Sequence, residues 1–203
     1  MEELKKVAID NDFLDHLLKI KGSRRNPLDE AALTDLIGRF FVAQELSPVM
    51  HSMVYEHEAL VFKNAVRDKL TQEGILSIIP LGDILKTKEG GETYYAMMVR
   101  EIYREFTGKP YPCKNVFQDW KSRMSLGEIH TVVMCAFLHY DCFLSDDSEA
   151  AKKLPGIVKR RLNHPISIDT RNACCARLRS RSEVDRQRLT SQELNWLSHT
   201  SRC

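Results

Sequence analysis

The sequence contains no run of apolar residues long enough to cross a membrane. A spanning helix needs roughly 18 to 20 such residues, and no segment of the 203-residue chain approaches that length. The opening decapeptide, MEELKKVAID, is charged and leads directly into an apolar stretch, unlike a secretory or transit peptide. Internal repeats and low-complexity tracts are also lacking. We therefore expect no membrane partner and a cytoplasmic location.

The six cysteines lack the spacing of a structural zinc site. No CxxC pair occurs, alone or combined with a histidine pair. Cys174 and Cys175 are adjacent, so on a helix they point about 100° apart and cannot share an ion as an isolated pair. His57-Glu58 opens a zinc-protease-like sequence, but Val61 stands where its second histidine is required. Zinc chemistry is not expected, and the cysteine pattern favours a reducing compartment.

Charge is nearly balanced over the whole chain but uneven along it. The net charge is +2, and 43% hydrophobic with 29% charged residues is ordinary for one globular domain. Residues 1–150 carry −6 and residues 151–203 carry +8. A basic tail can hold phosphates that the acidic part would repel. The alternative is a solvated helix face that only neutralises the rest of the domain.

Acidic residues follow two short apolar segments. Val7–Ile9 is a predicted strand that leads into Asp10-Asn11-Asp12, and Phe143–Ser145 is a predicted strand that leads into Asp146 and Asp147. Because ligands of parallel α/β sheets bind at the carboxyl ends of strands, these acids are candidate ligands of a divalent cation. Each acid could instead cap a helix, Asp12 that over Phe13–Lys19 and Asp146 or Asp147 that near Ser148.

Further acids lie on predicted helices. Glu128 opens a segment whose apolar residues recur every three or four positions, as on a helix with one buried face. Glu56 and Glu58 lie on a long helix predicted over Met50–Leu70. They are two residues apart and therefore about 200° apart around the helix axis. Only one of these two can face a common site.

The remaining chain alternates between predicted helices and strands. Ser47-Pro48 should end an apolar segment, and Leu154–Gly156 should break the helix that follows Asp147. Predicted helices cover Phe13–Ile20, Leu28–Gly38 and Glu92–Phe106, a loop covers Lys21–Pro27, and strands cover Ile75–Pro80 and Pro165–Ile168.

The C-terminal segment is predicted to be helical and basic. A helix from Thr170 carries Arg177, Arg179 and Arg181, and a last helix starts with a capping box at Thr190–Glu193. That last helix has few apolar residues and needs another surface. We expect it to pack on the domain, on a second subunit, or on an inhibitory partner protein.

Four segments resemble the PIN-domain family of metal-dependent nucleases. They are AIDNDFLDHL (8–17), SMVYEHEAL (52–60), GEIHTVVMCA (127–136) and FLSDDSEA (143–150). The resemblance implies a catalytic set of Asp10, Glu58, Glu128 and Asp147 with Ser145 as a hydroxyl, and the same four acids plus Asp146 as the metal set. Glu56 is the rival of Glu58. The chain departs from the family at Asp12, where Asn is usual, at Glu128, where many members have Asp, and after Asp169, where no motif matches.

This resemblance also implies a fold and an activity. The fold is a three-layer α/β/α domain over residues 1–169 with a mostly parallel sheet of four or five short strands, plus a helical extension over 170–203. The activity is hydrolysis of RNA, or DNA, phosphodiesters, most simply by an endoribonuclease, with Mg²⁺ or Mn²⁺ activating the attacking water. Small members of the family often act as toxins with a cognate antitoxin. Nucleic acid would contact the basic residues Lys159, Arg160, Arg161, Arg177, Arg179 and Arg181.

Two other functions remain open from the sequence. VAIDNDFL also resembles the opening of haloacid-dehalogenase-type phosphohydrolases, in which Asp10 would be the nucleophile and Asp12 the acid/base. That family generally has Thr or Val where this chain has Leu14, and no matching lysine motif is apparent. The second alternative is a PIN-like module that binds RNA or protein without cleaving.

Overall fold

The protein is an α/β protein built on one five-stranded parallel sheet, here described from a computed structural model. The structure describes residues 4–23, 26–59, 64–118, 125–180 and 189–198. The strand order is β5-β4-β1-β6-β7, and every neighbouring pair is parallel. The strands are β1 (Lys5–Ile9), β4 (Leu46–His51), β5 (Ser77–Ile79), β6 (Cys142–Leu144) and β7 (Ser167–Asp169). A two-stranded antiparallel pair, β2 (Gly22–Ser23) and β3 (Asn26–Pro27), lies apart from the sheet.

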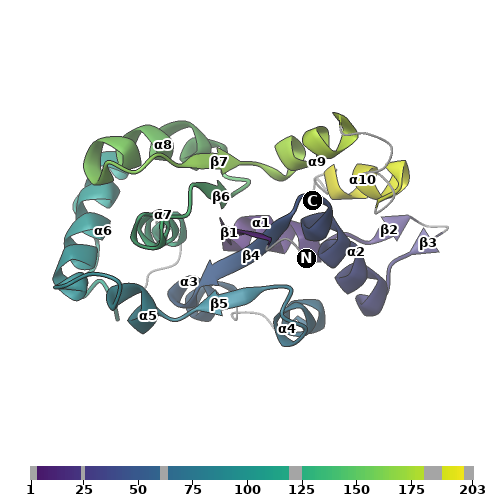
Figure 1. Cartoon of the computed structure of the whole chain (residues 1–203), viewed down its shortest axis with the longest axis horizontal. Helices are drawn as coiled ribbons and strands as arrows, with labels where there is room; N and C mark the ends of the chain where they lie inside the picture. The colour runs from purple at the N-terminus through teal and green to yellow at the C-terminus, as the bar shows by residue number, and fades with distance from the viewer. Residues whose placement is uncertain (1–3, 24–25, 60–63, 119–124, 181–188, 199–203) are drawn as a thin grey trace.

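Helices cover both faces of the sheet, giving three layers (Figure 1). One face carries α1 (Asn11–Leu18), α2 (Glu30–Ala43), α4 (Ala65–Gln72), α9 (Arg171–Ser180) and α10 (Ser191–Ser198). The other carries α5 (Leu81–Leu85), α6 (Gly91–Thr107), α7 (Leu126–Leu138) and α8 (Ser148–Leu162). The short α3 (Ser52–His57) follows β4 directly. The predicted α/β/α class and parallel sheet are confirmed.

The central strand β1 is buried on both faces. Val7 and Ile9 point into the first helical layer and Ala8 into the second, as the period-two geometry of a strand requires. The neighbouring β4 behaves alike, with Met50 on one face and Val49 on the other. Strands buried on both sides read as continuous apolar runs, which is why they stand out in the sequence.

Two of the predicted element boundaries were wrong because proline did not end an element. Pro48 lies inside β4, in register with Val7 of β1. Pro155 lies inside α8. There Leu154, Ile157 and Val158 are buried in the second core, and this packing outweighs the helix-breaking cost of proline, about 3 kcal/mol.

Three other predicted elements differ from the structure. The long helix over Met50–Leu70 is wrong, since Met50 and His51 complete β4 and two separate helices follow, α3 and α4. Helix α2 extends to Ala43, and the predicted loop over 21–27 contains β2 and β3. Helix α5 has no counterpart among the predicted elements. Val49, Met50 and His51 are buried in the sheet, and this burial stabilises the strand more than the local helical pattern stabilises a helix.

The C-terminal helices pack on the domain itself. Cys174, Cys175 and Leu178 of α9 and Leu194 and Leu197 of α10 join the same core as Val7 and Ile9. The predicted capping box is confirmed, because Thr190 N donates to Glu193 Oε2 at 2.7 Å and Glu193 N donates to Thr190 Oγ1 at 3.2 Å.

None of the described helices combines the length and the apolar character that crossing a bilayer requires. All five cysteines in the described ranges are free thiols, and Cys203 lies outside those ranges.

Candidate functional site

The candidate site lies where the strand order of the sheet reverses. From β1 the chain moves outward to β4 and β5, then returns to place β6 and β7 on the other side of β1. Asp10 follows β1 and Ser145–Asp147 follow β6, so these residues share the carboxyl edge of two neighbouring strands (Figure 1). The Asp10 N–H donates to Leu144 O at 3.2 Å and ties the two strand ends together. Such a switch point is the usual ligand crevice of an open α/β sheet.

Asp10 is the most deeply buried acid of this edge. Its side chain is 2% exposed, and Oδ1 accepts a hydrogen bond from Phe13 N at 2.8 Å, which caps α1. Oδ2 has no hydrogen-bond partner among the described residues. Burial raises the pKa of Asp10 well above its usual range, and the charges of Glu128 and Asp12 add to the effect, while Ser145 and Phe13 oppose it. The alternative that Asp12 caps this helix is wrong, because Asp10 does.

Glu128 reaches the same edge from the first turn of α7. Burial raises its pKa to about 7, with repulsion from Asp147 and Asp12 adding to the shift. A carboxyl group with this pKa is half protonated near neutral pH. Glu128 therefore holds a proton that a cation could displace.

Asp12 and Asp147 complete the set. Asp147 caps α8 by accepting from Glu149 N at 2.7 Å and Ala150 N at 2.9 Å. Asp12 is more exposed, yet partial desolvation raises its pKa and repulsion from Asp147 contributes. We call Asp10, Asp12, Glu128 and Asp147 the acidic cluster, because the charge of each member raises the pKa of another or, for Asp10, its own pKa is raised by two of the others. Four like charges at one edge is an unfavourable arrangement without a counter-charge.

Glu58, rather than Glu56, lies beside the start of α7. A Cβ added to Gly127 would lie 2.8 Å from Glu58 Oε2 and 2.9 Å from Oε1. The Glu58 carboxylate thus occupies the space left by the missing side chain, one residue before Glu128. Glu56 is exposed.

Asp146 is engaged differently from Asp147. His16 Nδ1 lies 2.8 Å from Asp146 Oδ2, Arg171 N donates to Oδ1 at 2.8 Å, and Arg171 Nε lies 3.3 Å from Oδ2. The last contact is an ion pair without good hydrogen-bond alignment. Asp146 thereby joins α1, the end of β6 and the start of α9, while its place as a metal ligand stays a prediction.

Several of the predicted nucleic-acid contacts pair with groups of the chain. Arg160 and Arg161 both bind Glu105 of α6, and Arg177 Nη1 lies 2.8 Å from Asp169 Oδ2. Arg179 donates to Leu194 O, Asn195 Oδ1 and Ser198 Oγ of α10. Lys159 is exposed. Arg181 lies outside the described residues.

A buried polar network, which was not predicted from the sequence, lies below this edge. Tyr95 Oη lies 2.8 Å from His51 Nε2 and 2.8 Å from His130 Nδ1, and all three side chains have 0% exposure. His51 ends β4, Tyr95 lies on α6, and His130 lies on α7 two residues after Glu128. The network therefore fixes the helix that carries Glu128 to the end of a central strand. The three residues are far apart in sequence and form no motif.

The donor set of the edge fits a hard divalent cation. Carboxylate oxygens are the ligands that Mg²⁺ and Mn²⁺ prefer, and the unpartnered Asp10 Oδ2 is a buried oxygen that such an ion would satisfy. Among the described residues, no group of three or more His, Cys, Asp or Glu side chains already stands in metal-binding geometry. The chemistry fits a cation, and ligation would require these carboxylates to close around it.

The fold and this edge define a class, a three-layer α/β protein with acidic residues at its switch point. Comparison with protein-family models, with curated proteins and with solved structures finds no match to this chain.

Proposed function

We propose that the chain is a metal-dependent nuclease, specifically an endoribonuclease, whose acidic cluster binds Mg²⁺ or Mn²⁺. The observation that carries the proposal is the convergence of Asp10, Glu128 and Asp147 at the switch point, with one buried Asp10 oxygen unpartnered. The resemblance to PIN domains supplies the substrate class.

The energetics of the cluster support a cation. Burial and repulsion raise the pKa values of Asp10, Asp12 and Glu128, so the ionised cluster is unfavourable in the protein alone. A divalent cation reverses this balance by making the ionised carboxylates the stable form. Binding should therefore release protons near neutral pH, chiefly from Glu128.

Each residue has a distinct part in this proposal. Asp10 and Asp147 are the principal ligands of the cation. Glu128 and Glu58 add negative charge beside it at the start of α7. Ser145 is fully buried, receives the Asp147 N–H at 3.1 Å through Oγ, and orients the turn that presents Asp147. Asp146 holds the edge together through His16 and Arg171. A bound cation would activate water and offset phosphate charge.

The first test compares thermal unfolding of the wild type and an Asp10→Asn/Asp147→Asn variant during titration with Mn²⁺ or Mg²⁺. Asparagine is as good a helix cap as aspartate, so both caps survive the change. We expect a metal-dependent rise in Tm in the wild type and in the control variant below, and no rise in the double variant. The matched control is Asp29→Asn, which alters an equivalent cap on α2, where Ala32 N donates to Asp29 Oδ1 at 2.8 Å.

Cleavage of a fluorogenic RNA by the same proteins tests the activity. Mn²⁺-dependent cleavage that is lost in the double variant and kept in Asp29→Asn supports the nuclease. Salt-sensitive RNA binding without cleavage would contradict the nuclease proposal and support a non-cleaving RNA-binding module. Turnover of a small phosphomonoester would contradict the nuclease proposal and support a phosphohydrolase, provided that Asp12→Asn abolishes this turnover.

A further inference from the structure

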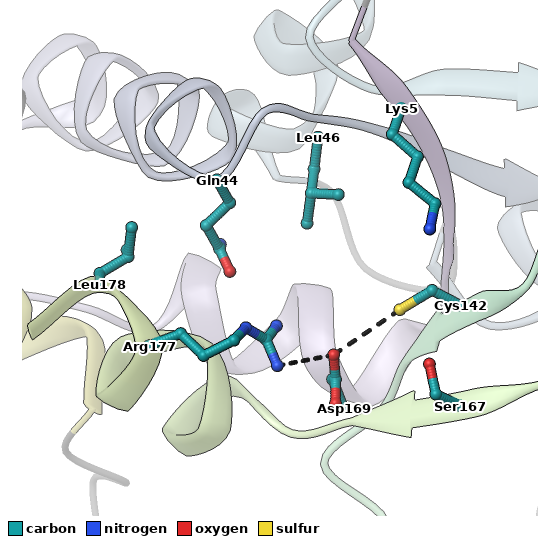
Figure 2. Close-up of a pocket in the computed structure, with 8 residues that line it drawn as sticks. All are labelled: Lys5, Gln44, Leu46, Cys142, Ser167, Asp169, Arg177 and Leu178. Carbon is teal, nitrogen blue, oxygen red and sulfur yellow. Dashed lines mark hydrogen bonds and ion pairs between the residues drawn. The ribbon is translucent and has the colours of Figure 1, made fainter. Parts of the chain in front are cut away.

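A hollow opens at the amino ends of the strands, the edge opposite to the acidic cluster (Figure 2). Lys5, Leu46, Cys142 and Ser167 line it and are the first residues of β1, β4, β6 and β7. Its volume is about 210 Å³. Pockets for drug-sized ligands typically span 300–1,000 Å³, so the hollow suits a smaller molecule.

The hollow is lined by two cations, Lys5 and Arg177, and by two side chains with acceptor oxygens, Gln44 and Asp169. Lys5 Nζ pairs with Asp141 at 2.7 Å, which uses one of its three N–H donors. Arg177 pairs with Asp169 Oδ2 at 2.8 Å, and the Cys142 thiol donates to the same oxygen at 3.7 Å. Lys5 can therefore donate to a further anionic group.

Gln44 supplies the second observation. Its side chain is 7% exposed, and Nε2 donates to Phe40 O at 3.3 Å. Its Oε1 has no partner among the described residues and faces the hollow (Figure 2). Buried carbonyl oxygens almost always have a donor, so the geometry calls for an N–H group from a ligand at this position.

We propose that this hollow binds a small zwitterion of the α-amino-acid type. Its carboxylate lies against Lys5, and its ammonium group donates to Gln44 Oε1 across the hollow (Figure 2). Leu46 and Leu178 provide an apolar wall for an aliphatic side chain. The site is separate from the acidic cluster and does not depend on the proposed nuclease activity.

Isothermal titration calorimetry of the full chain tests this with three related probes. L-valine has both charged groups, isovalerate lacks its ammonium group, and isobutylamine lacks its carboxylate. We expect saturable binding of L-valine at millimolar concentration and at least about tenfold weaker binding of the other two, because each loses one charged contact. Absence of L-valine binding, or equal binding of the three probes, overturns the proposal.

Variants locate the site. Lys5→Gln should weaken L-valine binding about tenfold or more, and the matched control Lys6→Gln should not, since Lys6 is an exposed neighbour on β1 outside the hollow. Gln44→Leu should abolish binding while Tm confirms a folded protein. Unchanged binding by folded Gln44→Leu, or equal losses in the two lysine variants, would place the ligand elsewhere and overturn the proposal.

Discussion

At the scale of single residues, Glu128 makes the stability of the metal-free protein depend on pH. Its folded pKa is about 7, whereas the ordinary value is 4.5. The folded state therefore binds more protons between these pH values, and the free energy of unfolding must fall as pH rises through this window. The stabilisation is fully present below about pH 4.5 and lost above about pH 7.

Replacing Glu128 by Gln should weaken this pH dependence and leave the part that comes from the raised pKa values of Asp10 and Asp12. The variant should be more stable than the wild type at pH 8 without metal, by at most roughly 3 kcal/mol, and should gain less from Mn²⁺. Urea unfolding at pH 5, 6, 7 and 8 measures it. The control Glu92→Gln alters an exposed acid in the first turn of α6 and should leave the pH profile unchanged. A wild-type profile that is flat over this range would contradict the prediction.

The candidate acids could be found from the sequence because each follows a recognisable element. Asp10 comes directly after an apolar strand, Asp147 lies three residues after another, and Glu128 lies in the first turn of a helix with an apolar face. Their environments could not be found in this way. The pairing of Asp146 with His16 joins residues 130 positions apart, and His51, Tyr95 and His130 meet only because three elements pack together.

At the scale of elements, the junction between α3 and α7 depends on a glycine. Gly127→Ala would place a Cβ against both Glu58 oxygens, which must then move. Because those oxygens end a flexible side chain, the free energy of unfolding should change by less than about 1 kcal/mol. Under the proposed function, the Mn²⁺ concentration needed for half of the Tm shift should rise.

Gly82→Ala is the matched control for this change. It adds a methyl group to α5 with no atom within 4 Å, so the Mn²⁺ response should stay at the wild-type value. Equal Mn²⁺ responses of Gly127→Ala and the wild type would separate Glu58 from the metal site.

The boundaries of some elements could not be predicted from the sequence, because two prolines lie inside elements and because burial in the sheet overrode a local helical pattern. Pro48 and Pro155 are breakers by local rules, but Pro48 precedes the residues of β4 that pair with β5, which begin at Val49, and α8 has a well-packed face. The segment after Pro48 has helical character in isolation and becomes a strand because β1 and β5 lie on either side of it. Whether this segment forms a strand or a helix depends on its neighbours in the assembled sheet, and a local sequence pattern does not describe those neighbours.

At the scale of the whole molecule, the basic C-terminal part joins the acidic N-terminal part by ion pairs. Arg160 lies 2.7 Å from Glu105 of α6, Arg161 pairs with the same carboxylate, and Arg171 lies beside Asp146. Part of the uneven charge of the sequence is thus neutralised within the fold. The hypothesis that the basic residues also bind nucleic acid remains a proposal.

Asp146→Asn tests how strongly the C-terminal part is held. Arg171 is 2% exposed, and the change would leave its charge buried without a carboxylate. We expect a loss of about 2–4 kcal/mol in the free energy of unfolding, measured by urea denaturation. Asp83→Asn, which removes an exposed pair with Lys86 at 3.4 Å, should cost less than about 1 kcal/mol. Similar losses in both variants would show that Asp146 acts as a surface charge.

The network below the acidic cluster has a defined direction for every proton. His51 Nδ1 accepts the Met53 N–H at 3.0 Å, so the ring hydrogen of this neutral imidazole must be on Nε2. Tyr95 then accepts from His51 and donates its own proton to His130 Nδ1 at 2.8 Å, which is closer than its other acceptor, His130 O, at 3.4 Å. His130 must in turn carry its hydrogen on Nε2, which faces Tyr111 Oη at 3.5 Å. One backbone amide in α3 thereby sets the tautomers of two rings and the orientation of a hydroxyl in a neighbouring helix.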